Sequence, residues 1–435
     1  MGLMAAVGAA FAALVQGVPV QGVPAASTAP VVVSPQGRVR SIGQALELAP
    51  AGGTIVIQAG VYREPTLQVR RPVTLIGERG AVLDGDGRRQ LITITGDDVT
   101  VRGLMLRNVG TSYTEDRAAI KAVGVRGCVI EDNQVEDGFF AIYLARTTGC
   151  RVARNVLVAH GRTEVGSGNG IHLWSSDSAL IEGNRISGHR DGIYFEFVRS
   201  SIIRGNTSER NLRYGLHFMY SDACHYRANL FRANGSGVAV MYSKNVEMTG
   251  NRFEDNWGSA AYGLLLKEMS DSRVVGNLFA RNTTALVAEG ADRLDARDND
   301  FVDDGWAVRL TASSSDARFS GNNFIGNTFD VATNSRQGSG TFTGNYWDAY
   351  RGYDLDRDGY GDVPHRPVRL FSLIVEHNDP ALILLRSLFV RVLDVAERTL
   401  PVLTPLQLSD ERPAMRPIQR TVTNAGSVAV TAGDR

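Results

Sequence analysis

Net charge and long apolar runs are both missing from this sequence. The chain carries 46 Lys and Arg against 46 Asp and Glu. Nucleic-acid binding needs a basic surface, so the balanced charge argues against that class of function. Beyond residue 26, no stretch reaches the roughly 18 apolar residues of a membrane span. Cysteine is scarce as well, with three residues in 435.

What the chain does contain is a repeat built on asparagine. Most copies have an apolar residue three positions before the asparagine and another two positions after it. The repeat length of about 22 residues is typical of one coil of a solenoid. We therefore predict an all-β, right-handed parallel β-helix over residues 39–348. The repeated residues are Asn133, Asn155, Asn184, Asn206, Asn229, Asn251, Asn277, Asn299, Asn322 and Asn345.

A second repeat runs in step with the first. Five segments begin with a glycine and then alternate with period two, as expected for a strand with one buried face. They begin at Gly170, Gly192, Gly215, Gly237 and Gly263. Two coils are longer than the rest, and we expect their extra residues to form loops near 162–168 and 256–260. Such insertions often carry function.

The three cysteines share one position in the repeat, five residues before an asparagine. They are Cys128, Cys150 and Cys224. Small residues occupy the same position in other coils, so we expect buried free thiols at a turn. A disulfide between Cys128 and Cys150, which fall in adjacent coils, is the alternative.

The ends of the chain have other compositions. Residues 1–26 are apolar and resemble a secretory signal peptide. Ser41 begins a short predicted helix that covers the open end of the first coil. After an Asp-rich loop at 349–365, residues 366–420 combine a predicted helix at 380–398 with a Pro-rich segment. That helix fits either a cap on the solenoid or a docking element, and residues 421–435 are predicted to be a disordered tail.

The Asp-rich segment is a calcium candidate. Its acidic residues and Gly359 match most of an EF-hand loop, but His365 stands where a bidentate Glu is expected. The segment therefore predicts either an altered Ca²⁺ site or a turn held by its own side chains. The candidate ligands are Asp354, Asp356, Asp358, Tyr360 and Asp362.

A copper candidate lies on the outward face of the strands that begin with glycine. Stacked coils are about 4.8 Å apart, which brings Met219 beside Met241 and leaves His217 two residues away. Thioether and imidazole ligands suit Cu(I) better than hard cations. The alternative is an aromatic and methionine patch that packs against a loop or a partner. The candidate ligands are His172, Glu196, His217, Met219 and Met241, whereas Met105 and Met248 fall at positions expected in the core.

Catalysis on polysaccharides is the main alternative function, because many parallel β-helices act on them. Hydrolysis needs two positioned carboxylates on one face. The nearest cluster here is Glu196, Lys267 and Glu268, and no two carboxylates share one position in adjacent coils. A secreted polysaccharide-binding or -modifying protein (a lyase, hydrolase or epimerase) stays as the second hypothesis.

The end of the predicted solenoid resembles the NosD family. The resemblance rests on Gly344-Asn-Tyr-Trp, on the Asp-rich segment that ends at Asp362-Val-Pro364, and on the Pro-rich stretch from Leu400 to Pro417. It extends over nearly the whole chain after the signal peptide.

This resemblance implies a periplasmic maturation protein of nitrous oxide reductase without catalytic turnover. The implied partners are the permease and ATPase of an ABC transporter, a copper chaperone lipoprotein and the reductase itself. The implied cargo is copper, held transiently as Cu(I), and the family motif does not identify its ligands.

Overall fold

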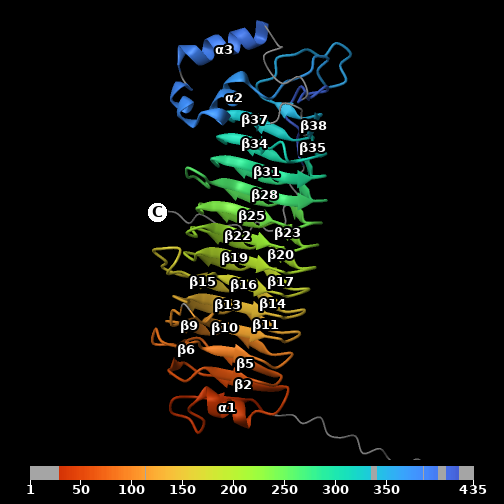
Figure 1. Ribbon diagram of the computed structural model, residues 1–435. Coiled ribbons are helices and arrows are strands. Elements are labelled where there is room, and N and C mark those ends of the chain that lie inside the picture. Colours follow the sequence, from red (N-terminus) through yellow and green to blue (C-terminus); the bar gives the residue numbers. More distant parts are fainter. Residues whose placement is uncertain (1–28, 113, 335–339, 386, 400–407, 421–435) are drawn as a thin grey trace, which may run out of the picture.

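The computed structural model describes residues 29–112, 114–334, 340–385, 387–399 and 408–420. Three long sheets of parallel strands enclose one core, and each coil of the chain contributes one strand to each sheet (Figure 1). The predicted parallel β-helix is confirmed. The predicted signal peptide (1–26) and tail (421–435) lie outside the described residues, as do residues 400–407 of the Pro-rich segment.

Sheet A has 14 strands in the described residues. They are β1 (Val31–Val33), β2 (Gly53–Ile57), β5 (Val73–Gly77), β8 (Thr100–Arg102), β11 (Val129–Glu131), β14 (Arg151–Ala153), β17 (Leu180–Glu182), β20 (Ile202–Arg204), β23 (His225–Arg227), β26 (Glu247–Thr249), β29 (Arg273–Val275), β32 (Asp295–Arg297), β35 (Ala317–Ser320) and β38 (Gly340–Thr343).

Sheet B has 13 strands in the part of the chain that the structure describes. They are β3 (Gly60–Tyr62), β6 (Ala81–Asp84), β9 (Met105–Arg107), β12 (Gln134–Glu136), β15 (Val156–Val158), β18 (Arg185–Ser187), β21 (Thr207–Glu209), β24 (Leu230–Arg232), β27 (Arg252–Glu254), β30 (Leu278–Ala280), β33 (Asp300–Val302), β36 (Asn323–Ile325) and β39 (Tyr346–Trp347).

Sheet C carries the glycine repeat, and its strands among the described residues number 12. They are β4 (Leu67–Val69), β7 (Ile92–Ile94), β10 (Ala118–Val123), β13 (Phe140–Ala145), β16 (Ile171–Trp174), β19 (Asp191–Glu196), β22 (Tyr214–Met219), β25 (Ser236–Met241), β28 (Tyr262–Ser270), β31 (Thr284–Asp292), β34 (Trp306–Leu310) and β37 (Phe329–Thr333).

The repeated asparagines form a continuous hydrogen-bonded ladder between sheets A and B. The side-chain oxygen of Asn155 accepts from the backbone N–H (3.0 Å) and the side-chain amide (3.1 Å) of Asn133 one coil earlier. The amide of Asn155 also donates to the carbonyl of Ile130 at 2.9 Å. The same pattern continues to Asn345, and these asparagines are buried. Each rung satisfies backbone groups of a turn that sheet pairing leaves unbonded.

The core is filled by stacked side chains of the same kind from coil to coil. Phe253, Phe279, Phe301 and Phe324 lie two residues after their ladder asparagines, and successive ring centroids are 4.7 to 4.9 Å apart. Trp347 ends the stack at 4.1 Å from Phe324. The apolar position predicted from the repeat is therefore the core position of sheet B.

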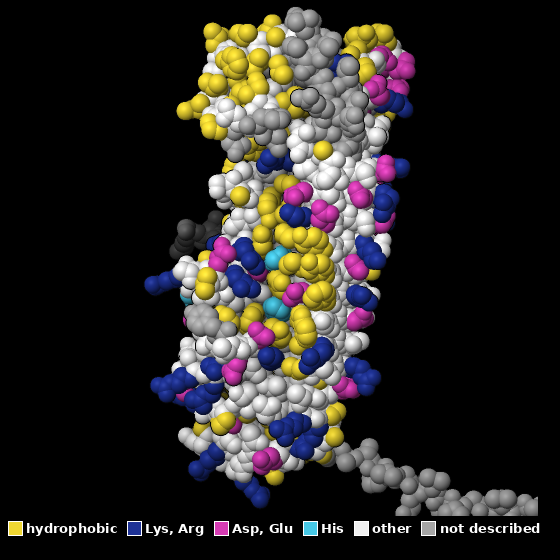
Figure 2. Space-filling model, in the orientation of Figure 1, with side chains coloured by type: hydrophobic (Ala, Val, Ile, Leu, Met, Phe, Trp, Pro, Cys, Tyr) yellow, Lys and Arg dark blue, Asp and Glu magenta, His cyan; other side chains and the backbone are white. Residues whose placement is uncertain are grey.

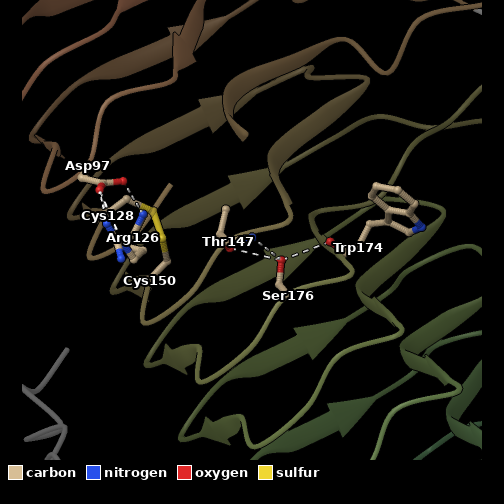
Figure 3. The surroundings of a disulfide bond; sticks show 7 residues. All are labelled: Asp97, Arg126, Cys128, Thr147, Cys150, Trp174 and Ser176. Atoms are coloured by element: carbon tan, nitrogen blue, oxygen red, sulfur yellow. Dashed lines mark hydrogen bonds and ion pairs between the residues drawn. A yellow bond between two sulfur atoms is a disulfide. The ribbon is translucent and has the colours of Figure 1, made fainter. Parts of the chain in front are cut away.

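The expectation for two of the cysteines was wrong. Cys128 and Cys150 form a disulfide across adjacent coils, with Cα atoms 4.6 Å apart, whereas Cys224 is a buried free thiol as expected. Figure 3 shows the bond beside Arg126, which pairs with Asp97 of the preceding coil. Residues at one position in adjacent coils stand at a separation that suits a disulfide.

The two ends of the solenoid are covered differently. Helix α1 (Ile42–Leu48) covers the first coils, and the side chain of Ser41 accepts from the N–H of Gln44 at 3.1 Å, as the capping prediction required. At the other end, α2 (Leu370–His377) packs Phe371 and Val375 in one cluster with Phe329 of β37. The described helices include none that is long and apolar enough to cross a membrane.

The helix predicted at 380–398 is wrong in its continuity. The structure has a 3-10 helix, η1 (Asp379–Leu384), followed by α3 (Leu388–Thr399), and α2 precedes both. Ala381 of η1 packs in the same apolar cluster as Phe371 and Val375 of α2 and Phe329 of β37.

The asparagine ladder ends on a residue that sequence spacing does not indicate. Asp410, in the segment 408–420 that returns along the last coils, accepts from the backbone N–H and the side-chain amide of Asn345, both at 2.9 Å. The same oxygen accepts from the indole N–H of Trp347 at 3.1 Å. A carboxylate thus replaces the asparagine of the coil that would come next.

We expect Asp410→Ala to destabilise the end of the solenoid. It leaves buried donors of Asn345 and Trp347 without an acceptor, at a cost of about 3 kcal/mol. Amide hydrogen exchange should show lost protection in the coils nearest residue 345 and little change near residue 133, because solenoid stability is local. Glu411→Ala, at the exposed neighbouring position, is the control. Equal protection in both variants would contradict this role for Asp410.

Candidate functional site

The outer face of sheet C carries two rows of side chains that run along the solenoid. The first, the histidine row, places Tyr143, His172, Tyr194, His217 and Ala239 in register on successive strands. The second, the methionine row, lies two residues further along each strand and contains Trp174, Glu196, Met219, Met241 and Lys267. The predicted neighbourhood of Met219 and Met241 is therefore correct. Figure 2 shows the histidines beside an apolar patch in the middle of this face.

The two rows differ in burial, which the sequence did not reveal. His172 and His217 are 9% and 7% exposed, whereas Glu196, Met219 and Met241 are half-buried. His172 stacks on Tyr143 at 4.5 Å, and its Nδ1 lies 3.0 Å from the side-chain amide of Asn169, in the inserted loop of residues 159–170. Burial lowers the pKa of His172 to about 3, so this imidazole is neutral at physiological pH.

His217 has a carboxylate beside it. Its Nδ1 lies 3.6 Å from Oδ2 of Asp191 and 3.3 Å from Nη2 of Arg213. Arg213 also holds Asp191 through Nε and Oδ1 at 2.9 Å. Burial alone would raise the pKa of Asp191, but hydrogen bonds from His217 and Arg213 lower it overall. Asp191 is fully buried, so Nδ1 of His217 faces both an anion, Asp191, and a hydrogen-bond donor, Arg213.

These residues fit the chemistry of a Cu(I) ligand set. Nε2 of His217 is buried and has no hydrogen-bond partner among the described residues. Of the two neutral tautomers, the one with the proton on Nδ1 leaves a lone pair on Nε2, which is the form in which a histidine binds a metal through that atom. Met219 and Met241 supply soft thioethers on the same face, and the hydroxyl of Tyr194 contacts the sulfur of Met219 at 3.8 Å.

Methionines outside this face divide between core and surface. Met248 is buried, as expected from its position in the repeat. Met105 is only half-buried, because its neighbour Leu106 takes the core position of β9. The expectation of a core position for Met105 was wrong by one residue.

Within the methionine row, no two carboxylates lie on adjacent strands among the described residues. Glu196 and Glu289 occupy the methionine row four coils apart, which corresponds to about 19 Å. Lys267, which the sequence places near Glu196 and Glu268, forms an ion pair with Glu289 at 3.1 Å. Hydrolysis of a glycoside would require carboxylates roughly 5–10 Å apart.

The Asp-rich loop brings three of its predicted ligands together. One ligand oxygen each from Asp354, Asp356 and Asp358 lies within 4.8 Å of the others. The loop is also held by its own backbone, since Asp354 accepts from the N–H of Gly359 at 3.0 Å and Asp362 from that of Leu355 at 2.7 Å.

Arg412 and His365 bear on whether the loop is a calcium site or a turn. Asp358 pairs with Arg412 at 2.7 Å, so an arginine already neutralises one carboxylate. His365 lies against the ring of Trp347, 5.0 Å away, and exchanges backbone hydrogen bonds with Asp410. Burial lowers the pKa of His365 to about 4. It does not take the place of the twelfth EF-hand ligand, and both interpretations of the loop stay open.

A calcium site at this loop predicts that millimolar Ca²⁺ raises the melting temperature of the protein. The cation would relieve the mutual repulsion of three carboxylates. Asp354→Asn with Asp356→Asn should remove the Ca²⁺-dependent shift. Asp255→Asn, at an exposed carboxylate paired with Arg281, should leave it intact. No shift in the unaltered protein would identify the loop as a turn held by its own hydrogen bonds and by Arg412.

A second asparagine ladder escaped the sequence analysis. It runs through Asn211, Asn234, Asn256, Asn282 and Asp304, and the side-chain oxygen of each later residue accepts from the backbone N–H of the one before. The signal was present, because each of these residues follows a first-ladder asparagine by five positions. This ladder holds the turns that lead into sheet C and so keeps the two outer rows in register.

Together, the described residues form a parallel β-solenoid protein with thioether and imidazole side chains on one outer face and a helical cap at its C-terminal end. The chain belongs to the NosD family. The family model described as "Periplasmic copper-binding protein (NosD)" matches residues 158–352. A probable ABC transporter binding protein NosD of Pseudomonas aeruginosa is 34% identical over 85% of this chain and 89% of its own length. Its counterpart from Stutzerimonas stutzeri is 28% identical over 84% and 88%.

Solved structures share the fold at low sequence identity. PfbA, a surface adhesin of Streptococcus pneumoniae, superposes with a TM-score of 0.59 at 13% identity, over 71% of this chain and 93% of the adhesin. The catalytic unit of an α-1,3-glucanase from Streptomyces thermodiastaticus gives 0.54 at 14% identity, over 75% and 69%. An adhesin and a glucanase on one fold show that the solenoid alone does not define an activity.

Proposed function

We propose that this protein works in the periplasm with an ABC transporter to assemble the copper centres of nitrous oxide reductase. It receives Cu(I) and passes it on without catalytic turnover. Its partners are the permease and ATPase of the transporter, a copper chaperone lipoprotein and the reductase. The observation that carries this proposal is the methionine row beside His217, in a family described as periplasmic and copper-binding.

The copper site consists of Met219, Met241 and Nε2 of His217. Two thioethers and one imidazole bind Cu(I) without the thiolates that would make it hard to release. Glu196 lies beside Met219 on the preceding strand and His172 lies two coils before His217. Because His172 is enclosed by Phe140, Tyr143 and Asn169, it supports the row rather than binding the ion directly.

Docking to the transporter uses the C-terminal cap. Leu388, Val392 and Val395 of α3 are 75%, 57% and 61% exposed, and Ile383 of η1 is 89% exposed. An apolar surface of this kind on a helix is typical of a protein contact. Figure 2 shows the apolar side chains gathered over the described helices at this end. Two curated relatives are named as ABC transporter binding proteins, which supports a transporter subunit as the occupant.

We expect Met219→Leu with Met241→Leu to lower the Cu(I) affinity of the purified protein by roughly tenfold or more, which corresponds to about 1.4 kcal/mol. Leucine keeps the volume of methionine but removes the sulfur ligand, so the fold should be unaffected. The measurement is an anaerobic Cu(I) titration against a competing chelator, with Zn²⁺ as the comparison metal. Met105→Leu, at a half-buried methionine on sheet B, is the matched control. An unchanged affinity in the double variant would remove this site from the proposal.

We expect Leu388→Asp with Val392→Asp to weaken binding to the detergent-solubilised transporter by at least about tenfold, since charge at an apolar contact is costly. The melting temperature should hold because both side chains are exposed. Val32→Asp with Val61→Asp adds the same charge at exposed valines near the opposite end. Equal weakening in both variants would indicate a general charge effect and argue against docking through the cap.

A further inference from the structure

Three exposed aromatic rings stack at the edge of the methionine row. Phe197, Tyr220 and Tyr242 follow Glu196, Met219 and Met241 directly in the chain. The ring centroids are 5.2 and 5.0 Å apart and the planes are within 13° of parallel. The side chains are 49%, 45% and 41% exposed. We call these three residues the aromatic ladder.

The backbone at this corner is unfavourable for aromatic residues. Phe197, Tyr220 and Tyr242 have φ values of 55°, 49° and 54°, in the left-handed region. Gly124 and Gly290 occupy the same corner in other coils, with φ of 65° and 64°. Most L residues are strained in this region, whereas glycine and asparagine adopt it at lower energy. Bulky rings in three successive coils at such positions, exposed rather than packed in the core, point to a selected function for their surface.

We propose that the aromatic ladder is the docking surface for a protein that delivers Cu(I) to Met219 and Met241, an inference that rests on the proposed function. Copper moves between proteins by exchange of ligands, so the carrier has to touch residues next to the receiving thioethers. The ladder meets this condition because two of its rings belong to the residues that follow the methionines. The copper stays Cu(I) throughout, and only its ligands change.

The compartment argues for a carrier rather than for free copper. The Cys128–Cys150 disulfide indicates an oxidising environment, where free Cu(I) does not persist. The half-buried thioethers face outward, where the surface of another protein can reach them. A receiving surface next to Met219 and Met241 is what the ladder provides.

The geometry of the rings favours a protein over a saccharide. Sugars stack on the faces of aromatic rings, but in this ladder each inner face is covered by the next ring. What the stacking leaves is the ring edges, the two tyrosine hydroxyls and one outer face at each end of the ladder, and aromatic edges pack against apolar side chains. Three rings at these exposures supply roughly 300 Å², whereas a specific interface buries about 800 Å² on each partner. The ladder thus forms the centre of an interface that also covers the methionine row.

The test compares copper delivery by a protein and by a small chelator. In Phe197→Asn/Tyr220→Asn/Tyr242→Asn, asparagine tolerates the left-handed backbone, so the melting temperature should not fall. Uptake of Cu(I) from a soluble chelate should match the unaltered protein within about twofold, because the thioethers remain. Transfer from the Cu(I)-loaded periplasmic copper chaperone of the same organism should slow by at least about tenfold.

The matched control is Arg146→Asn/Ser175→Asn/Glu268→Asn, at exposed positions of the same corner with φ of 53°, 48° and 50°. It should transfer copper normally. Tyr220→Asn alone, at the central ring, serves if the triple variant does not fold, and it should slow transfer in the same direction.

Three results would overturn the inference. One is an unimpaired transfer rate from the chaperone in the aromatic variants. Another is slowed transfer only from this protein to the reductase, which would make the ladder an exit surface. The third is binding of alginate or peptidoglycan oligosaccharides that depends on the three rings. If the unaltered protein takes no Cu(I) even from the chelate, the proposed function fails and this inference fails with it. Normal loading from the chelate with unimpaired chaperone transfer overturns the inference alone.

Discussion

The hydrogen bond from one asparagine side chain to the next coil is the interaction on which this molecule depends. The turns between sheets A and B leave backbone groups that strand pairing cannot satisfy, and burial makes an unsatisfied group expensive. Each asparagine supplies one acceptor and two donors at that point. Because the side chain reaches only one coil away, the ladder also sets the register. Every row on the outer faces inherits its alignment from that constraint.

That dependence explains how much the sequence could predict. Register within the repeat follows from the spacing of the asparagines, so the fold and the pairing of Met219 with Met241 were predictable. Contacts between distant segments were not. Asp410 lies 65 residues from Asn345, beyond any repeat, and nothing local indicates that the chain returns to cap the ladder. The burial of His172 depends on Asn169, whose loop has no counterpart in most coils.

The wrong expectations concern contacts that a residue's place in the sequence does not reveal. Position in a repeat predicts which residues become neighbours, but not whether those neighbours form a bond. Cys128 and Cys150 stood at equivalent positions, and the separation between coils is also the separation a disulfide needs. The helix expected at 380–398 was judged from its own residues alone. Ala381 of η1 packs in one cluster with Phe329 of β37, about 50 positions earlier.

The copper site that we propose on the outer face of sheet C has to meet two opposing requirements. A Cu(I) site needs ligands held in position, yet a carrier has to reach and release the ion. The solenoid separates these tasks by two residues along one strand. His217 is buried and held by Asp191 and Arg213, whereas Met219 is half-buried at the edge of the face. At the following residue the chain turns through a left-handed corner and leaves Tyr220 exposed. Successive coils repeat this path, so the histidine row, the methionine row and the aromatic ladder run parallel to one another. A partner that docks on the aromatic ladder therefore also contacts the methionine row.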